Sequence, residues 1–151
     1  MCRCSATGEL RPRPLTLCSD PLPFRCISKD KANAEVLYVD IDYPALITDK
    51  VAIIAQTPEL QGFLSEQQHY PTPVDHVHYR SRQYLALGCD LRDLDTLRRL
   101  FQVHGLIDTA IFFTAEVSLT FMARESVDAL IQWAATLPDG NSEDPQLSAL
   151  D

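Results

Sequence analysis

The sequence predicts an α/β protein built on a parallel sheet. Three apolar segments, 36–41, 83–90 and 109–116, each carry an acidic residue at or just beyond the carboxyl end. Each of these segments is followed by one with helical periodicity. Strands that alternate with helices in this way are typical of sheets whose strands run parallel and whose faces are covered by helices.

Size and charge limit the classes of function. The 151 residues are the size of one domain. A net charge of −8 is the opposite of the broad basic surface that DNA-binding proteins present, although a local patch for RNA stays open. There is no signal-peptide pattern and no apolar run long enough to span a membrane. Five irregularly spaced cysteines favour free thiols over a zinc site. We therefore expect a cytoplasmic protein without a DNA, membrane or metal partner.

The first strand-and-helix unit is the clearest. Residues 36–41 form a continuous apolar run, as in a strand covered on both faces. Proline 44 is suited to the first position of a helix, and the segment 44–56 continues with helical periodicity. The residues predicted to face the core are Ala45, Leu46, Val51, Ile54 and Ala55.

The segment 57–80 is predicted to be mostly loop, because Pro58, Gly62, Pro71 and Pro73 interrupt it. It also contains the pair His76 and His78, for which a solvated loop is a better interpretation than a metal site.

Two further units complete the pattern. The strand 83–90 precedes an amphipathic helix at 91–105, and the strand 109–116 precedes a helix at 123–137. The inward residues are predicted to be Leu94, Leu97, Leu100 and Phe101 in the earlier helix, and Val127, Leu130, Ile131 and Ala134 in the later one. Gly105 is expected just beyond the end of its helix, where a left-handed residue is common.

Acidic residues recur where the predicted strands end: Asp42, Asp90 and Glu116. Ligands of open parallel sheets bind outside the carboxyl ends of the strands. Three carboxylates there would suit a ligand with hydroxyl and amino donors and a positive charge, such as an adenine nucleoside with a sulfonium, and would repel a polyphosphate. Each acid also has a structural interpretation. Asp40 and Asp42 could be turn residues before Pro44 or could cap the next helix, and Asp90 could be the N-cap of the helix that follows it. Glu116 lies between apolar residues, where an acid needs a partner.

The segments "YVDIDYPALITDK", "YLALGCDLRDL" and "TAEVSLTFMARESVDALIQWA" resemble the leucine carboxyl methyltransferase family. The resemblance extends from about Asp20 to Leu137. It implies a Rossmann-like fold that uses S-adenosyl-L-methionine, with Asp42 on the ribose hydroxyls, Asp90 and Leu91 around the adenine, and Glu116 near the methionine portion. No catalytic acid or base is expected, because the accepting carboxylate is already ionised at neutral pH.

The motifs "DPLPF" and "AEVS" resemble most the branch of the family that acts on tRNA. That branch implies methyl ester formation on a modified guanosine side chain, with tRNA(Phe) carrying a wybutosine precursor as the partner. The alternatives are the branch that methylates the C-terminal leucine of the protein phosphatase 2A catalytic subunit, a non-catalytic fragment of such an enzyme, and a nicotinamide-binding Rossmann protein.

The sequence also departs from the family. In "LTLCSDPLPF" the two glycines of the family's cofactor turn fall on Thr16 and Cys18, neither of which has the backbone freedom of glycine. We therefore expect an incomplete fold, with the first, central strand degraded and the later strands absent. The predicted organisation is a disordered arm at 1–17, a partial methyltransferase domain at 18–138 and a disordered tail at 139–151.

Overall fold

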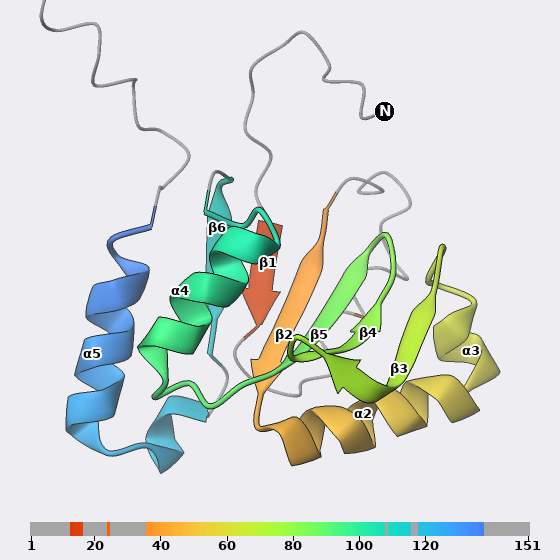
Figure 1. Cartoon of the computed structure of the whole chain (residues 1–151), viewed down its shortest axis with the longest axis horizontal. Coiled ribbons are helices and arrows are strands. Elements are labelled where there is room, and N and C mark those ends of the chain that lie inside the picture. Colours follow the sequence, from red (N-terminus) through yellow and green to blue (C-terminus); the bar gives the residue numbers. More distant parts are fainter. Residues whose placement is uncertain (1–12, 17–23, 25–35, 108, 116–117, 138–151) are drawn as a thin grey trace, which may run out of the picture.

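A computed structural model (Figure 1) describes residues 13–16, 24, 36–107, 109–115 and 118–137. Within this part of the chain the sheet has six strands in the order β3-β4-β5-β2-β1-β6. The strands are β1 (Arg13–Thr16), β2 (Tyr38–Asp42), β3 (Gln68–Val74), β4 (Val77–Arg80), β5 (Tyr84–Gly88) and β6 (Ile111–Thr114). The helices are α2 (Pro44–Gln56), α3 (Pro58–Gln61), α4 (Leu94–Val103), the 3₁₀ helix η1 (Ser118–Phe121) and α5 (Arg124–Ala134).

Four neighbouring strands are parallel, as the alternation of strands and helices predicts. β2 pairs with β5 on one side and with β1 on the other, and β1 pairs in turn with β6. Numbered along the chain among themselves, these strands lie in the order 3-2-1-4, which agrees with the first four strands of the Rossmann order 3-2-1-4-5-6. The α/β class is confirmed, and the carboxyl ends of the four strands meet at one edge of the sheet.

The central strand is present, contrary to the prediction that it is degraded. β1 lies between β2 and β6, with Leu15 opposite Val39 and Thr16 opposite Thr114. It also falls inside the segment 1–17, which is predicted from the sequence to be a disordered arm. Cys18, on which the second glycine of the family's turn falls, lies outside the described residues, and the other domain limits stay predictions.

The prediction of a loop at 57–80 is wrong. The short helix α3 is followed by the hairpin β3–β4, which extends the sheet in antiparallel fashion beyond β5. Pro71 and Pro73 lie in β3, which is the outermost strand of the order. A proline is tolerated in an edge strand, because its missing N–H is needed only where a neighbouring strand accepts it.

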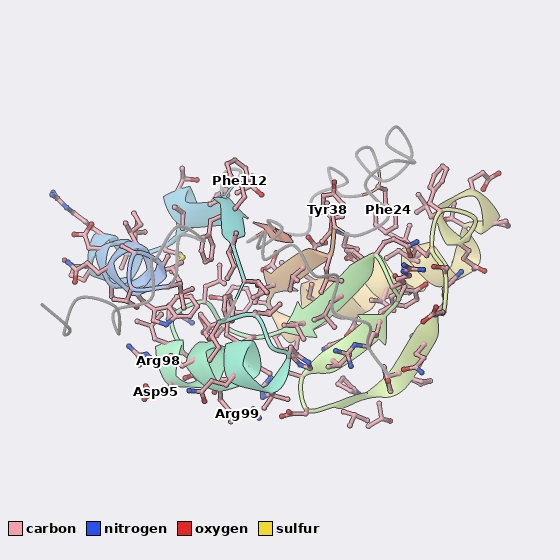
Figure 2. All side chains as sticks on the ribbon, turned by 90° about the horizontal axis from the view of Figure 1, so that it is seen from above. Phe24, Tyr38, Asp95, Arg98, Arg99 and Phe112 are labelled. Atoms are coloured by element: carbon pink, nitrogen blue, oxygen red, sulfur yellow. The ribbon has the colours of Figure 1, made fainter. Side chains whose placement is uncertain are left out.

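The two faces of the sheet carry separate cores. On one face, side chains of β2 and β5 such as Ile41 and Leu87 pack with Leu97 and Phe101 of α4 and with Trp133 of α5. On the other face, α2 packs against three tyrosines of the sheet. Its residues Ile47, Val51 and Ile54 lie in one cluster with Tyr38, Tyr79 and Tyr84. Figure 1 shows α4 and α5 together, away from α2. In Figure 2, Phe112 of β6 projects from the same side as Tyr38, and it is 62% exposed.

The helices lie where the sequence predicts them, but some of them bury a different face from the one predicted. α2 has the predicted bounds, but Ala45, Leu46 and Ala55 are exposed and Ile47 is buried instead. In α4 the predicted inward positions are confirmed at Leu97, Leu100 and Phe101, and Gly105 has the expected left-handed backbone with φ of 62°.

In α5, Leu130 is buried as predicted, while Ile131 is 53% exposed. Trp133 takes the inward place and packs edge-on to Phe101. No helix in the part of the chain described here is long and apolar enough to cross a membrane.

Candidate functional site

The predicted ligand residues Asp42 and Asp90 lie at the same edge of the sheet. Asp42 is the last residue of β2 and stands opposite Gly88, the last residue of β5. The two strand ends are held together by a backbone hydrogen bond of 2.8 Å in which the Cys89 N–H donates to the Asp42 carbonyl. The chain then continues directly into Asp90. The sheet therefore brings these two acids together, as the sequence predicts.

The carboxylate of Asp42 turns back on the chain that follows it. The residue is half-buried, and its Oδ1 accepts a hydrogen bond of 2.7 Å from the Tyr43 N–H. This bond fixes the carboxylate at the start of α2, whose first residue is Pro44.

Asp90 has a partner that the sequence alone does not predict. The Nε and Nη2 atoms of Arg92 donate to its two carboxylate oxygens at 2.9 and 2.6 Å, and the Arg92 backbone N–H donates to Oδ1 at 2.9 Å. These bonds lower the pKa of Asp90 and keep the carboxylate ionised. The guanidinium also lies 5.9 Å from the centroid of the Tyr43 ring, a cation–π distance. Arg92 therefore connects the loops after β2 and β5; the only signal in the sequence is the Asp-x-Arg spacing.

Of the two other predicted ligand residues, one is described. Leu91 is buried and packs in the core under α4, and none of the hydrogen bonds formed among the described residues uses its backbone N–H. Glu116 lies outside the described residues. β6 runs parallel to β1 and ends at Thr114, so the chain leaves β6 at the same edge as Asp42 and Asp90.

Asp40 does not belong to this edge, and its interpretation as a turn residue is wrong. Its side chain is fully buried in the middle of β2, facing α2. There Lys50 of α2 forms an ion pair with Oδ2, and the Tyr84 hydroxyl donates to the same atom at 2.7 Å. The Lys50 ammonium also lies 5.7 Å from the centroid of the Tyr84 ring. The group ties α2 to the sheet, which fixes where the helix begins beside Asp42.

A polar cavity lies beside the strand ends that carry Asp42 and Asp90. A cavity of about 360 Å³ is lined by Pro44, Pro73, Asp75, His76, His78 and Gly88, where the turn of the β3–β4 hairpin meets the start of α2 (Figure 1). His78 is only 4% exposed, and burial, followed by the charge of His76, lowers its pKa. The interpretation as loop residues is therefore wrong for His78, which is buried in β4, whereas His76 does lie in the turn between β3 and β4.

Among the described residues there is neither a cluster that could hold a metal ion nor a reactive thiol. No group of three or more His, Cys, Asp and Glu side chains there has the arrangement of a metal site. Cys89 is a buried free thiol, and burial, together with the charges of Asp93 and Asp90, raises its pKa to about 11. A thiol with that pKa is a poor nucleophile at neutral pH.

The chain is similar over most of its length to proteins named tRNA wybutosine-synthesizing protein 4. The protein from Gibberella zeae is 40% identical over 120 residues, which is 78% of this chain and 12% of that relative. The one from Emericella nidulans is 38% identical over 134 residues, 87% of this chain and 12% of the relative. The one from Eremothecium gossypii is 37% identical over 128 residues, 81% of this chain and 18% of the relative.

The chain thus spans only 12–18% of the length of these relatives. No protein-family model matches it.

Proposed function

Starting from its homology to a segment of tRNA wybutosine-synthesizing protein 4, we propose that this chain is part of a methyltransferase that uses S-adenosyl-L-methionine. The proposed substrate is the side-chain carboxylate of a wybutosine precursor in tRNA(Phe), and the product is its methyl ester. The observation that carries the proposal is the meeting of Asp42 and Asp90 at the ends of two adjacent parallel strands.

The hydrogen-bonding groups at this edge of the sheet suit a nucleoside. Carboxylates are acceptor-only groups when ionised, and the pKa of Asp90 is lowered by its Arg92 partner. Asp42 would accept from the ribose hydroxyls, and Asp90 from the exocyclic amine of adenine. The backbone N–H of Leu91 would donate to a ring nitrogen of the same base. Glu116, which follows the end of β6 by two residues in the sequence, is proposed for the methionine portion.

When bound, S-adenosyl-L-methionine supplies an electrophilic methyl group on a positively charged sulfur. The chain's own residues would bind and orient. Asp42 and Asp90 fix the nucleoside at the sheet edge, and the Lys50–Asp40 ion pair holds α2, and with it the loop after Asp42, in place. The accepting carboxylate needs no deprotonation at neutral pH, so alignment and exclusion of water suffice for catalysis by this site.

Calorimetric titration of the purified chain with S-adenosylhomocysteine tests the proposal. We expect micromolar binding that weakens at least about tenfold in Asp42→Ala and in Asp90→Ala, since each variant loses hydrogen bonds to a charged acceptor worth about 1.5–3 kcal/mol. The matched control is Asp95→Ala, whose carboxylate is 96% exposed and pairs with Arg98 on the surface of α4. A folded chain that binds no S-adenosylhomocysteine would mean a non-catalytic fragment.

A further inference from the structure

The cavity beside Asp42 and Asp90 is built around a buried histidine with one ring nitrogen unused. Among the described residues, the Nδ1 of His78 is 3.2 Å from the Thr48 hydroxyl oxygen, and no hydrogen bond is formed by its Nε2. That atom lies against Gly88: a Cβ added at Gly88 would stand 2.3 Å from it. His78 and Gly88 both line the cavity.

The hydrogen-bond network fixes which nitrogen of His78 carries the proton. Thr48 has one hydroxyl hydrogen, and it donates this to the Pro44 carbonyl at 2.8 Å. The same oxygen must then accept from the Nδ1–H of His78, because a hydroxyl offers one donor and two lone pairs. Burial lowers the pKa of His78, which keeps the ring neutral at pH 7. Its Nε2 is therefore an acceptor.

The ring nitrogen of His76 that accepts a hydrogen bond can be assigned in the same way. Its Nδ1 is 2.8 Å from the Gly88 carbonyl oxygen, which can only accept, so in the neutral ring Nε2 carries the lone pair. The residue sits in the hairpin turn with a left-handed φ of 66°, next to Asp75 with φ of 47°. Positive φ at both central residues is the favoured geometry of a two-residue hairpin turn, and both residues line the cavity.

The lining selects a chemical class of ligand. It offers two imidazole acceptors, the Asp75 carboxylate and the rings of Pro44 and Pro73, and it contains no Lys or Arg. An anionic group is therefore disfavoured inside, whereas a flat ring with amino donors is suited to it. The volume falls in the range of roughly 300–1,000 Å³ typical of small-molecule sites.

A cation stands at the rim of the cavity. The guanidinium of Arg99 in α4 pairs with the Asp75 carboxylate at 2.5 Å and is about half exposed. Single-stranded RNA is bound by this combination, in which bases enter pockets or stack on rings while guanidinium groups contact the phosphates outside.

We propose that this cavity is a subsite for one base of single-stranded RNA, a base that carries an exocyclic amino group and donates it to the Nε2 atoms of His76 and His78. The identification of the ligand as RNA rests on the proposed function. The subsite is separate from the nucleoside position at Asp42 and Asp90, and it would hold a nucleotide beside the one that is modified.

The test is a titration of the whole chain, labelled with ¹⁵N at histidine, followed by NMR of the ring nitrogens and run with saturating S-adenosylhomocysteine present throughout. The probes are hexamers of adenylate, cytidylate and uridylate. We expect the Nε2 resonances of His76 and His78 to shift with the adenylate and cytidylate hexamers. Binding of the uridylate hexamer should be at least about fivefold weaker, because uracil has no amino group. The exposed His69 of β3 is the internal control and should not move.

Thr48 gives a matched pair of variants on the exposed side of α2. Thr48→Val removes the acceptor that fixes the His78 tautomer, so affinity for the adenylate hexamer should fall, whereas Thr48→Ser should retain it. Ring resonances that stay in place with every hexamer, or equal affinity for uridylate, would overturn the proposal. So would shifts already produced by S-adenosylhomocysteine alone, which would place the cofactor's base there. Calorimetry with S-adenosylhomocysteine, read at Asp42 and Asp90, reports separately on the proposed function.

Discussion

Replacement of Lys50 by methionine is expected to destabilise the fold strongly, although the substitution preserves most of the side-chain volume. The Asp40 carboxylate is fully buried, and Lys50 is only 11% exposed. Without the ammonium, the buried carboxylate loses the cation that is paired with it, although the Tyr84 hydroxyl still donates to it at 2.7 Å.

The magnitude follows from that geometry. Breaking a buried ion pair by removing one partner costs about 3–5 kcal/mol. Because the Tyr84 hydroxyl continues to donate and Lys50 reaches partly to solvent, we expect the lower end, about 3 kcal/mol. With a urea dependence of about 2 kcal/mol per M, the midpoint of unfolding should fall by about 1.5 M.

The assay is urea unfolding followed by circular dichroism for wild type, Lys50→Met and the double variant Asp40→Asn/Lys50→Met. The double variant should recover part of the loss, since both charges are then absent. Arg98→Met removes an exposed pair with Asp95 and should cost less than about 1 kcal/mol. The reasoning is refuted if Lys50→Met and Arg98→Met shift the midpoint equally, or if the double variant is no more stable than Lys50→Met.

Three further results are expected. Gly88→Ala should lower stability by about 1–3 kcal/mol, measured by thermal unfolding, because the new Cβ would lie 2.3 Å from His78 Nε2 and 3.0 Å from the Pro44 Cα; an unchanged melting temperature would contradict this. Burial lowers the pKa of His78 and of His104, so below the ordinary value of 6.5 the folded state binds fewer protons than the unfolded state. The free energy of unfolding should therefore be full above that pH and should fall as the pH drops below it. Equal urea midpoints at pH 7.5 and pH 5.5 would contradict this expectation. Arg92→Ala should let the pKa of Asp90 rise toward its ordinary value, as followed by carboxyl ¹³C NMR, while Arg92→Lys should keep part of the depression; identical titrations of all three proteins would exclude the proposed pairing.

The parallel strands and their helices could be predicted because their signals are local. The apolar run before Asp42 and the proline that opens α2 give the strand and the helix start directly. The face that α2 buries could not be read in the same way. Ile47 is buried and Leu46 is 48% exposed, because the loop after β2 sets the rotation of the helix on the sheet, and periodicity alone does not contain that angle.

The hairpin and β1 were missed for a common reason. Both contain prolines, at positions 14, 71 and 73, and proline is normally evidence against a strand. β3 accommodates them as the outermost strand, whereas β1 is held by parallel neighbours on both sides. Pairing between residues distant in sequence overrides the local signal in both cases.

For the candidate site, the residue types were predictable and their partners were not. Asp42 and Asp90 stand out because acids at strand ends are visible in the sequence. The Arg92–Tyr43 contact and the His78–Thr48 bond join residues of different elements, and only the folded chain brings them together. Asp40 could not be separated from Asp42 by spacing alone, since the strand is buried on both faces and does not alternate.

The most direct test of the central claim is backbone amide NMR of the ¹⁵N-labelled chain during titration with S-adenosylhomocysteine. If the nucleoside lies at the ends of β2 and β5, the largest shifts will fall on Tyr43, Asp90 and Leu91, while amides on the outer side of α5 will not move. Saturable binding whose shifts cluster elsewhere, with the loops after Asp42 and Cys89 unaffected, would contradict the account.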